Sequence, residues 1–210
     1  SWDQAQAIAT GLSNSSVVPG SCSEDDGTGC DYVQVGLTLF DSTVEVVTDP
    51  GEDTNVTING EVSSSNPGGL TGIAAVANEV ATTSALQDPE HENIAILITD
   101  AKANTTNQVL DTVASLCAAR DRASAPVDTY AIHLGPSSDE DLAGLFAAAG
   151  GTGYCCPGNS TTCAPSAQID PCSYAMLGGA ITQTGSSPYT QAQMVANTIT
   201  CAGSRGLSDV

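Results

Sequence analysis

The sequence predicts an α/β fold, in which a doubly wound, mostly parallel sheet has helices on both faces. The first observation behind this prediction is that strand-like stretches alternate with stretches at helical spacing through the first 150 residues. The second is length, because 210 residues suffice for one domain with a full core. We therefore expect a single domain over 1–210, with a Cys-rich insertion at 155–185.

The first half of the chain contains four predicted elements. They are a helix over 3–12, a strand over 32–40, an antiparallel partner over 44–47 and a helix opening at 66–69. In the first strand apolar and polar residues alternate, which is the pattern of a half-buried strand. A turn at Asp41 and Ser42 joins the two strands.

Five predicted elements follow in the second half. They are a strand over 94–99, a helix over 107–122, a strand over 129–134, a helix that a capping box of Ser137 and Glu140 opens, and a last helix from Ser187 with Val195 and Ile199 inward. The strand over 94–99 is almost continuously apolar, as a parallel strand covered on both faces must be. This strand is expected at the centre of the fold.

The net charge of the chain limits the classes of molecule that it can bind. The chain has 24 acidic and 4 basic residues, for a formal charge of -20. Such a surface repels nucleic acid and anionic lipid and attracts cations. No apolar stretch approaches the roughly 18 residues of a membrane span, so we expect no membrane insertion. The acidity indicates either a solvated surface suited to a salty exterior or specific carboxylates that bind a divalent cation.

The cysteines indicate an oxidising compartment. There are eight: Cys22, Cys30, Cys117, Cys155, Cys156, Cys163, Cys172 and Cys201. An even number with five of them clustered predicts disulfides, and the short separation of Cys22 and Cys30 favours a local one. A zinc site is the alternative, but adjacent cysteines followed by wide gaps do not match CxxC spacing. We expect an extracellular or cell-surface protein whose leader has been removed.

Five stretches in order resemble a von Willebrand factor type A (VWA) domain. They are "YVQVGLTLFDSTVEVV", "GGLTGIAAVANEVA", "IAILITDAKAN", "TYAIHLG" and "DLAGLFAAAGGTGY". These are similar to the second strand with its hairpin partner, the glycine-threonine loop with its helix, the fourth strand with its Thr-Asp exit, the fifth strand, and the helix after it. The resemblance covers about residues 1–154 and implies a VWA-like fold.

The resemblance also implies a metal site. In that family Mg²⁺ or Ca²⁺ sits at the top of the sheet in a metal-ion-dependent adhesion site. Asp100 matches the Asp that ends the fourth strand, and Thr71 matches the loop threonine, although Leu70 takes that column in a gapless alignment. The family's Asp-x-Ser-x-Ser motif is absent, and Ser1 is at most its last serine. For Asp100, a carboxylate that caps the following helix or loop is the alternative.

The resemblance leaves a gap in the centre of the expected sheet. The family's first strand lies between the strands that match 33–39 and 94–98, and the given sequence contains no counterpart. Three fillers are considered: a separate N-terminal peptide, a strand donated by a neighbouring subunit, or a local segment over 173–181. Without a filler, buried backbone groups would lack partners, at about 1 to 3 kcal/mol each.

Two further groups of residues are candidates for a calcium site and for a catalytic site. Carboxylates around the Cys22 to Cys30 loop suggest either a structural Ca²⁺ site or an exposed acidic turn; they are Glu24, Asp25, Asp26 and Asp31. His91 and His133 have no serine or cysteine nucleophile in a recognisable elbow, so a catalytic triad is not expected. We predict that the protein is not an enzyme.

Three functions are consistent with these observations. The first is an exported adhesion or assembly module that binds a protein ligand, with Asp100 and Thr71 helping to hold a divalent cation. The second is a structural subunit of a surface layer or filament, in which disulfides supply durability and the metal site is silent. The third is an accessory domain attached to a secreted hydrolase.

Overall fold

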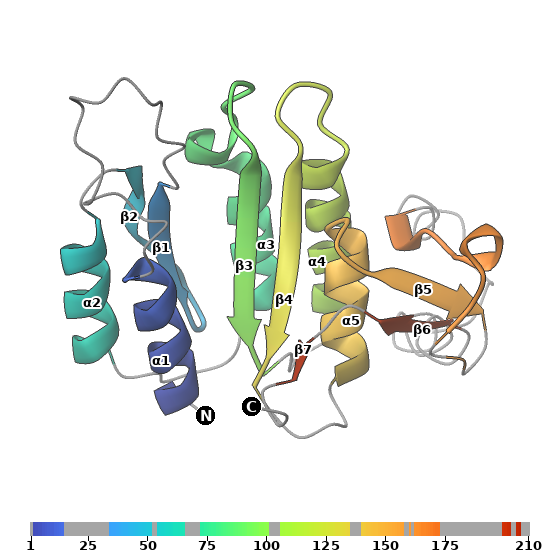
Figure 1. Ribbon diagram of the computed structural model, residues 1–210, viewed down its shortest axis with the longest axis horizontal. Helices are drawn as coiled ribbons and strands as arrows, with labels where there is room; N and C mark the ends of the chain where they lie inside the picture. The colour runs from blue at the N-terminus through green and yellow to red at the C-terminus, as the bar shows by residue number, and fades with distance from the viewer. Residues whose placement is uncertain are drawn as a thin grey trace, which may run out of the picture. The chain divides into compact units, whose positions relative to one another are not determined.

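The described residues form a mixed α/β structure with five α-helices and seven strands (Figure 1). It is a computed structural model, and it describes residues 2–14, 34–51, 54–65, 72–100, 106–134, 140–157, 160, 162–172, 199–202 and 205–206. The chain divides into an N-terminal unit, Ser1–Gly69, and a C-terminal unit, Leu70–Val210. Each unit is described below by itself.

The N-terminal unit combines two helices with a hairpin. In order, its elements are α1 (Trp2–Ser13), β1 (Val35–Phe40), β2 (Val44–Gly51) and α2 (Asn55–Ser64). The two strands pair antiparallel, which confirms the predicted hairpin. Asp41 makes the turn, because its carboxylate accepts hydrogen bonds from the backbone N–H and the hydroxyl of Thr43.

Helix α2 was not predicted. Its segment is rich in Asn, Gly and β-branched residues, which are poor helix formers, and contacts with α1 compensate. Trp2 donates from Nε1 to the carbonyl of Ser65 at 3.1 Å, and Gln6 donates from Nε2 to the carbonyl of Val62 at 2.6 Å. Ile58 and Val62 are buried. Tertiary packing therefore decides the conformation of this segment.

The C-terminal unit is built around parallel strands. Its elements are α3 (Ile73–Thr82), β3 (Asn93–Thr99), α4 (Thr106–Arg120), β4 (Val127–His133), α5 (Glu140–Ala149), β5 (Tyr154–Pro157), β6 (Ile199–Ala202) and β7 (Arg205–Gly206). Strands β3, β4 and β7 form one parallel sheet in the order β3-β4-β7. The predicted β-α-β alternation is confirmed for β3, α4 and β4.

Burial on β3 differs from the prediction. We expected a strand covered on both faces, but Ile94 and Ile96 are 43% and 42% exposed, whereas Leu97 and Thr99 are buried. In Figure 1, α3 and α4 lie behind β3 and β4, and no described helix of this unit lies in front of them. The sheet therefore has one covered face among the described residues.

The described strands form three sheets and not one. Strand β1 pairs with β2, β3 with β4, and β5 with β6 in a second antiparallel pair. The strands that were expected to flank one empty slot, β1 and β3, belong to different hydrogen-bonded sheets. The single doubly wound sheet is therefore not confirmed.

The Cys-rich segment is held by disulfides. Cys117 pairs with Cys172, Cys155 with Cys201, and Cys156 with Cys163. Every cysteine among the described residues is paired, as predicted, and Cys22 and Cys30 lie outside that part of the chain. The prediction that Ile199 lies on a helix was wrong, because it begins β6 beside Pro157 of β5. Cys155 and Cys201 are register partners in this ladder, and their disulfide holds β6 beside β5.

Candidate functional site

The carboxyl edge of the parallel sheet is the candidate site. Thr99 of β3 and His133 of β4 are register partners, and the N–H of Leu134 donates to the carbonyl of Thr99 at 2.8 Å. On the other side of β4, Gly206 of β7 pairs with His133. Three parallel strands therefore end together, and open α/β sheets bind their ligands at such an edge.

Asp100 lies at this edge, where the sequence placed it. It follows β3 directly and is half-buried. Helix α4, which follows β3, begins near the same carboxyl edge of the sheet. The N-terminus of a helix carries partial positive charge that favours a carboxylate nearby. Both interpretations of Asp100, as a cation ligand and as a cap, are consistent with this position.

The structure does not describe the other predicted ligands. Thr71 and Ser1 lie outside the described residues, and Gly72, the N-cap of α3, is the nearest described neighbour of Thr71. The carboxylates of the acidic loop also lie outside them: Glu24, Asp25, Asp26 and Asp31. Ser137 of the capping box also lies outside the described residues, and the described part of α5 begins at Glu140, the other residue of that motif.

His133 also lies at this edge, although it was not predicted as a site residue. It is 3% exposed, and its Nε2 is a buried atom that finds no hydrogen-bond partner among the described residues. A buried polar group without a partner costs about 1 to 3 kcal/mol. The sequence placed His133 in a predicted strand, but only the register between β3 and β4 brings it beside Thr99 at this edge.

The donor chemistry of the edge fits a cation only in part. Mg²⁺ and Ca²⁺ prefer hard oxygen ligands, which the Asp100 carboxylate can supply, whereas an imidazole such as that of His133 suits zinc and other transition metals. Within the described residues, no three His, Cys, Asp or Glu side chains lie close enough together to hold a metal ion. Further ligands would have to come from residues such as Thr71.

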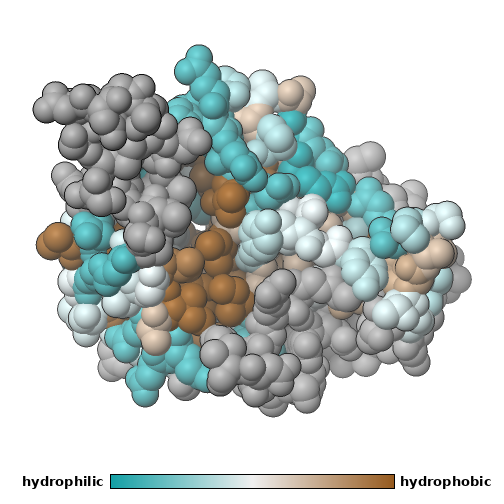
Figure 2. All heavy atoms as spheres, viewed as in Figure 1, coloured by the Kyte–Doolittle hydropathy of each residue, from teal (hydrophilic) through white to brown (hydrophobic). Residues whose placement is uncertain are grey.

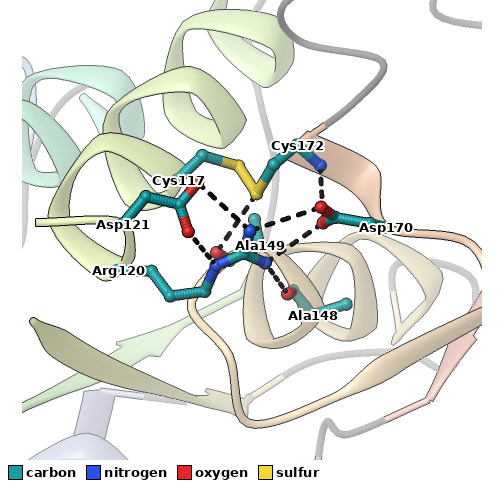
Figure 3. The surroundings of a disulfide bond; sticks show 7 residues. All are labelled: Cys117, Arg120, Asp121, Ala148, Ala149, Asp170 and Cys172. Carbon is teal, nitrogen blue, oxygen red and sulfur yellow. Dashed lines mark hydrogen bonds and ion pairs between the residues drawn. A yellow bond between two sulfur atoms is a disulfide. The ribbon is translucent and has the colours of Figure 1, made fainter.

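A second cluster surrounds the Cys117–Cys172 disulfide (Figure 3). The Arg120 guanidinium lies between two carboxylates, donating from Nε to Asp121 at 2.8 Å and from Nη1 to Asp170 at 3.1 Å. Arg120 and Asp170 also line a pocket of about 260 Å³. Because carboxylates already occupy the guanidinium, the cluster clamps the Cys-rich segment to α4 and does not offer a free anion site.

The pKa of Asp170 reflects this clamp. Burial alone would raise the pKa, but hydrogen bonds from Arg120 and from the backbone N–H of Cys172 outweigh burial and hold the pKa below its ordinary value of 3.8. A lowered folded-state pKa means that the folded state binds the proton less well than the unfolded state. The pair therefore stabilises the fold above that ordinary value, and the contribution disappears as the pH falls through the folded-state pKa.

Asp170→Asn tests this linkage. The side chain of Asp170 is 53% exposed, so we expect the variant to lose under about 1 kcal/mol of stability at neutral pH. The difference should shrink as the pH is lowered toward 2, because the native carboxyl gains its proton as the pH falls through its lowered pKa. Urea unfolding at both pH values measures the difference, with Asp111→Asn on the exposed face of α4 as the control. A deficit that persists unchanged near pH 2 contradicts the expectation.

Arg122 also serves the fold. Its guanidinium donates to the carbonyls of Leu86, at 2.7 Å, of Val80, at 3.2 Å, and of Ala81. These carbonyls lie at and just beyond the C-terminal end of α3, where a cation is favoured by the helix dipole. Two of the four basic residues of the chain, Arg120 and Arg122, are thus engaged internally.

The fold and the edge together define a mixed α/β protein with a parallel strand pair, tied by disulfides. Comparison of the sequence with protein-family models finds no matching family, and comparison with curated proteins finds no matching relative. None of the described helices is long and apolar enough to cross a membrane.

Proposed function

We propose that this protein is an exported, non-enzymatic binding module of the VWA kind, which holds a divalent cation at the carboxyl edge of its parallel sheet. The observation that carries the proposal is the position of Asp100, directly after β3 where the parallel strands end. The sequence resemblance assigns Thr71 and Ser1 to the same site. The three disulfides of the described residues are compatible with an extracellular protein.

In this function the residues of the chain hold the ion incompletely. Asp100 supplies one carboxylate oxygen, and Thr71 and Ser1 supply hydroxyl oxygens, which carry no charge. When bound, the cation has an open coordination position that a carboxylate oxygen of a protein partner can fill. The acidic surface favours cations in general, so a specific site must be distinguished from bulk attraction.

Calorimetric titration with Mg²⁺ and with Ca²⁺ tests the site. We expect heat of binding in the native protein, about tenfold or more weaker binding in Asp100→Ala because a charged ligand is lost, and unchanged binding in Asp111→Ala. Asp111 is an exposed carboxylate on α4 and controls for the general acidity. The absence of heat in the native protein, or equal losses in the two variants, would contradict the proposal.

A structural subunit of an extracellular filament or surface layer is the second candidate. It is favoured by the disulfides and by the edge of β3 opposite β4, with which no other described strand pairs. A strand from a neighbouring subunit can add to such an edge. In that function Mg²⁺ and Ca²⁺ produce no specific heat, and partner binding survives a chelator.

A further inference from the structure

One face of the parallel sheet, which no described helix of its unit covers (Figure 1), carries an apolar surface. Register pairs place Ile94 beside Asp128, Ile96 beside Tyr130 and Ile98 beside Ile132. These residues alternate along β3 and β4 with buried ones such as Leu97 and Thr129, so they share the face opposite the covered one. Figure 2, viewed from the same side as Figure 1, shows apolar atoms gathered where β3 lies. Three side chains of this open face are more than two-fifths exposed: Ile94 at 43%, Ile96 at 42% and Tyr130 at 48%.

An apolar face of this kind is unusual for parallel strands. Parallel sheets occur almost only with both faces covered, and the usual cover is a helix. A strand added to the edge of β3 would not cover the face, because Tyr130 stands on the inner strand β4. The distribution of exposed side chains over two strands therefore fits a helix that lies across them.

The negative charge of the chain indicates which kind of helix would bind to this face. Asp128 lies on the open face, and the chain as a whole carries a formal charge of -20. Two of its four basic residues, Arg120 and Arg122, are engaged with carboxylates and carbonyls. A second copy of this chain would bring more negative charge to this face and no charge complementarity, whereas Lys or Arg beside an apolar stripe would be attracted.

We propose that the open face of β3 and β4 binds an amphipathic helix of a partner protein, in which Lys or Arg residues flank an apolar stripe. The stripe covers Ile94, Ile96 and Tyr130, and the basic residues meet Asp128 and the surrounding acidic surface. This surface is separate from the carboxyl edge of the sheet, so the interaction requires no metal ion.

Three synthetic peptides test the proposal. A strand of seven residues spans about 23 Å, which a helix of about 15 residues matches. The first peptide has a Leu stripe flanked by Lys, the second has Glu in place of Lys, and the third keeps Lys but has Gln in place of Leu. Fluorescence anisotropy at about 0.15 M salt, where long-range charge effects are screened, measures binding to the full chain. We expect binding of the first peptide and at least about tenfold weaker binding of the other two.

Surface variants complete the test. Ile96→Thr with Tyr130→Thr keeps strand propensity and should weaken binding of the first peptide about tenfold, whereas Val56→Thr should not change it. Val56 is 76% exposed on α2 and is the matched control. Failure of the first peptide to bind, or equal binding to native and double variant, overturns the proposal. So does reversible dimerisation abolished by the double variant, which makes a second copy the occupant. A melting temperature far below that of Val56→Thr overturns it too, because the face is then covered from within the chain.

Discussion

Removal of the Cys117–Cys172 disulfide should lower the free energy of unfolding by about 4 kcal/mol, the largest effect that we expect from any local change. The bond closes a loop with a sequence separation of 55, and the chain-entropy model assigns about that value to a loop of this length. We expect Cys117→Ala with Cys172→Ala to melt roughly 10 °C below the native protein. Thermal unfolding followed by circular dichroism without reductant measures the shift.

The Cys156–Cys163 disulfide provides the control. It spans only 7 residues in sequence, so its removal by the same pair of substitutions should cost about 2 kcal/mol. Neither variant changes Arg120 or Asp170 themselves. If the shorter loop proves equally costly, loop closure is not the origin of the stabilisation.

Gly150→Ala should destabilise the C-terminal unit by about 3 kcal/mol, the upper end of the usual cost of overpacking. A Cβ at this position would lie 2.4 Å from the Cβ and 2.9 Å from the carbonyl oxygen of Thr129. The backbone cannot move away freely, because Thr129 donates its N–H to Gly150 at 2.8 Å and accepts a bond from the Thr152 hydroxyl at 2.5 Å. Urea unfolding provides the measurement.

The matched control for this substitution should raise the free energy of unfolding instead of lowering it. Gly60 lies inside α2, and a Cβ there would meet nothing within 4 Å. Gly60→Ala should therefore stabilise the protein by about 0.5 to 1 kcal/mol through helix propensity. If both alanines have the same effect, the close approach of α5 to β4 does not explain the result at Gly150.

The elements of the fold that local pattern determines were predictable. The alternation in β1, the apolar run of β3 and the helical spacing of α4 each indicated the correct type of element. The helix α2 was not predictable in this way, because Trp2 and Gln6 of α1 supply the contacts that offset its weak propensity. The pairing of β6 with β5 depends on a disulfide between cysteines 46 residues apart, and sequence alone does not specify such connectivity.

The candidate site was predictable at one position. Asp100 was identified because a carboxylate at the exit of an apolar strand points to the rim of a sheet. His133 was missed because its role depends on the register between two strands, in which Thr99 and His133 are partners. The open face with Ile94, Ile96 and Tyr130 was missed for a related reason. A continuous apolar run does not reveal which of its two faces a helix covers.

The engagement of Arg120 and Arg122 inside the fold has a consequence for resistance to proteases. Proteases of the trypsin type need a basic side chain in their specificity pocket, and this chain of 210 residues contains only four. Of these, Arg120 is held by Asp121 and Asp170, and Arg122 by carbonyls at the end of α3. A protease specific for Lys or Arg therefore has few bonds to cleave in this chain. At two of them, the hydrogen bonds of Arg120 or Arg122 must first be disrupted.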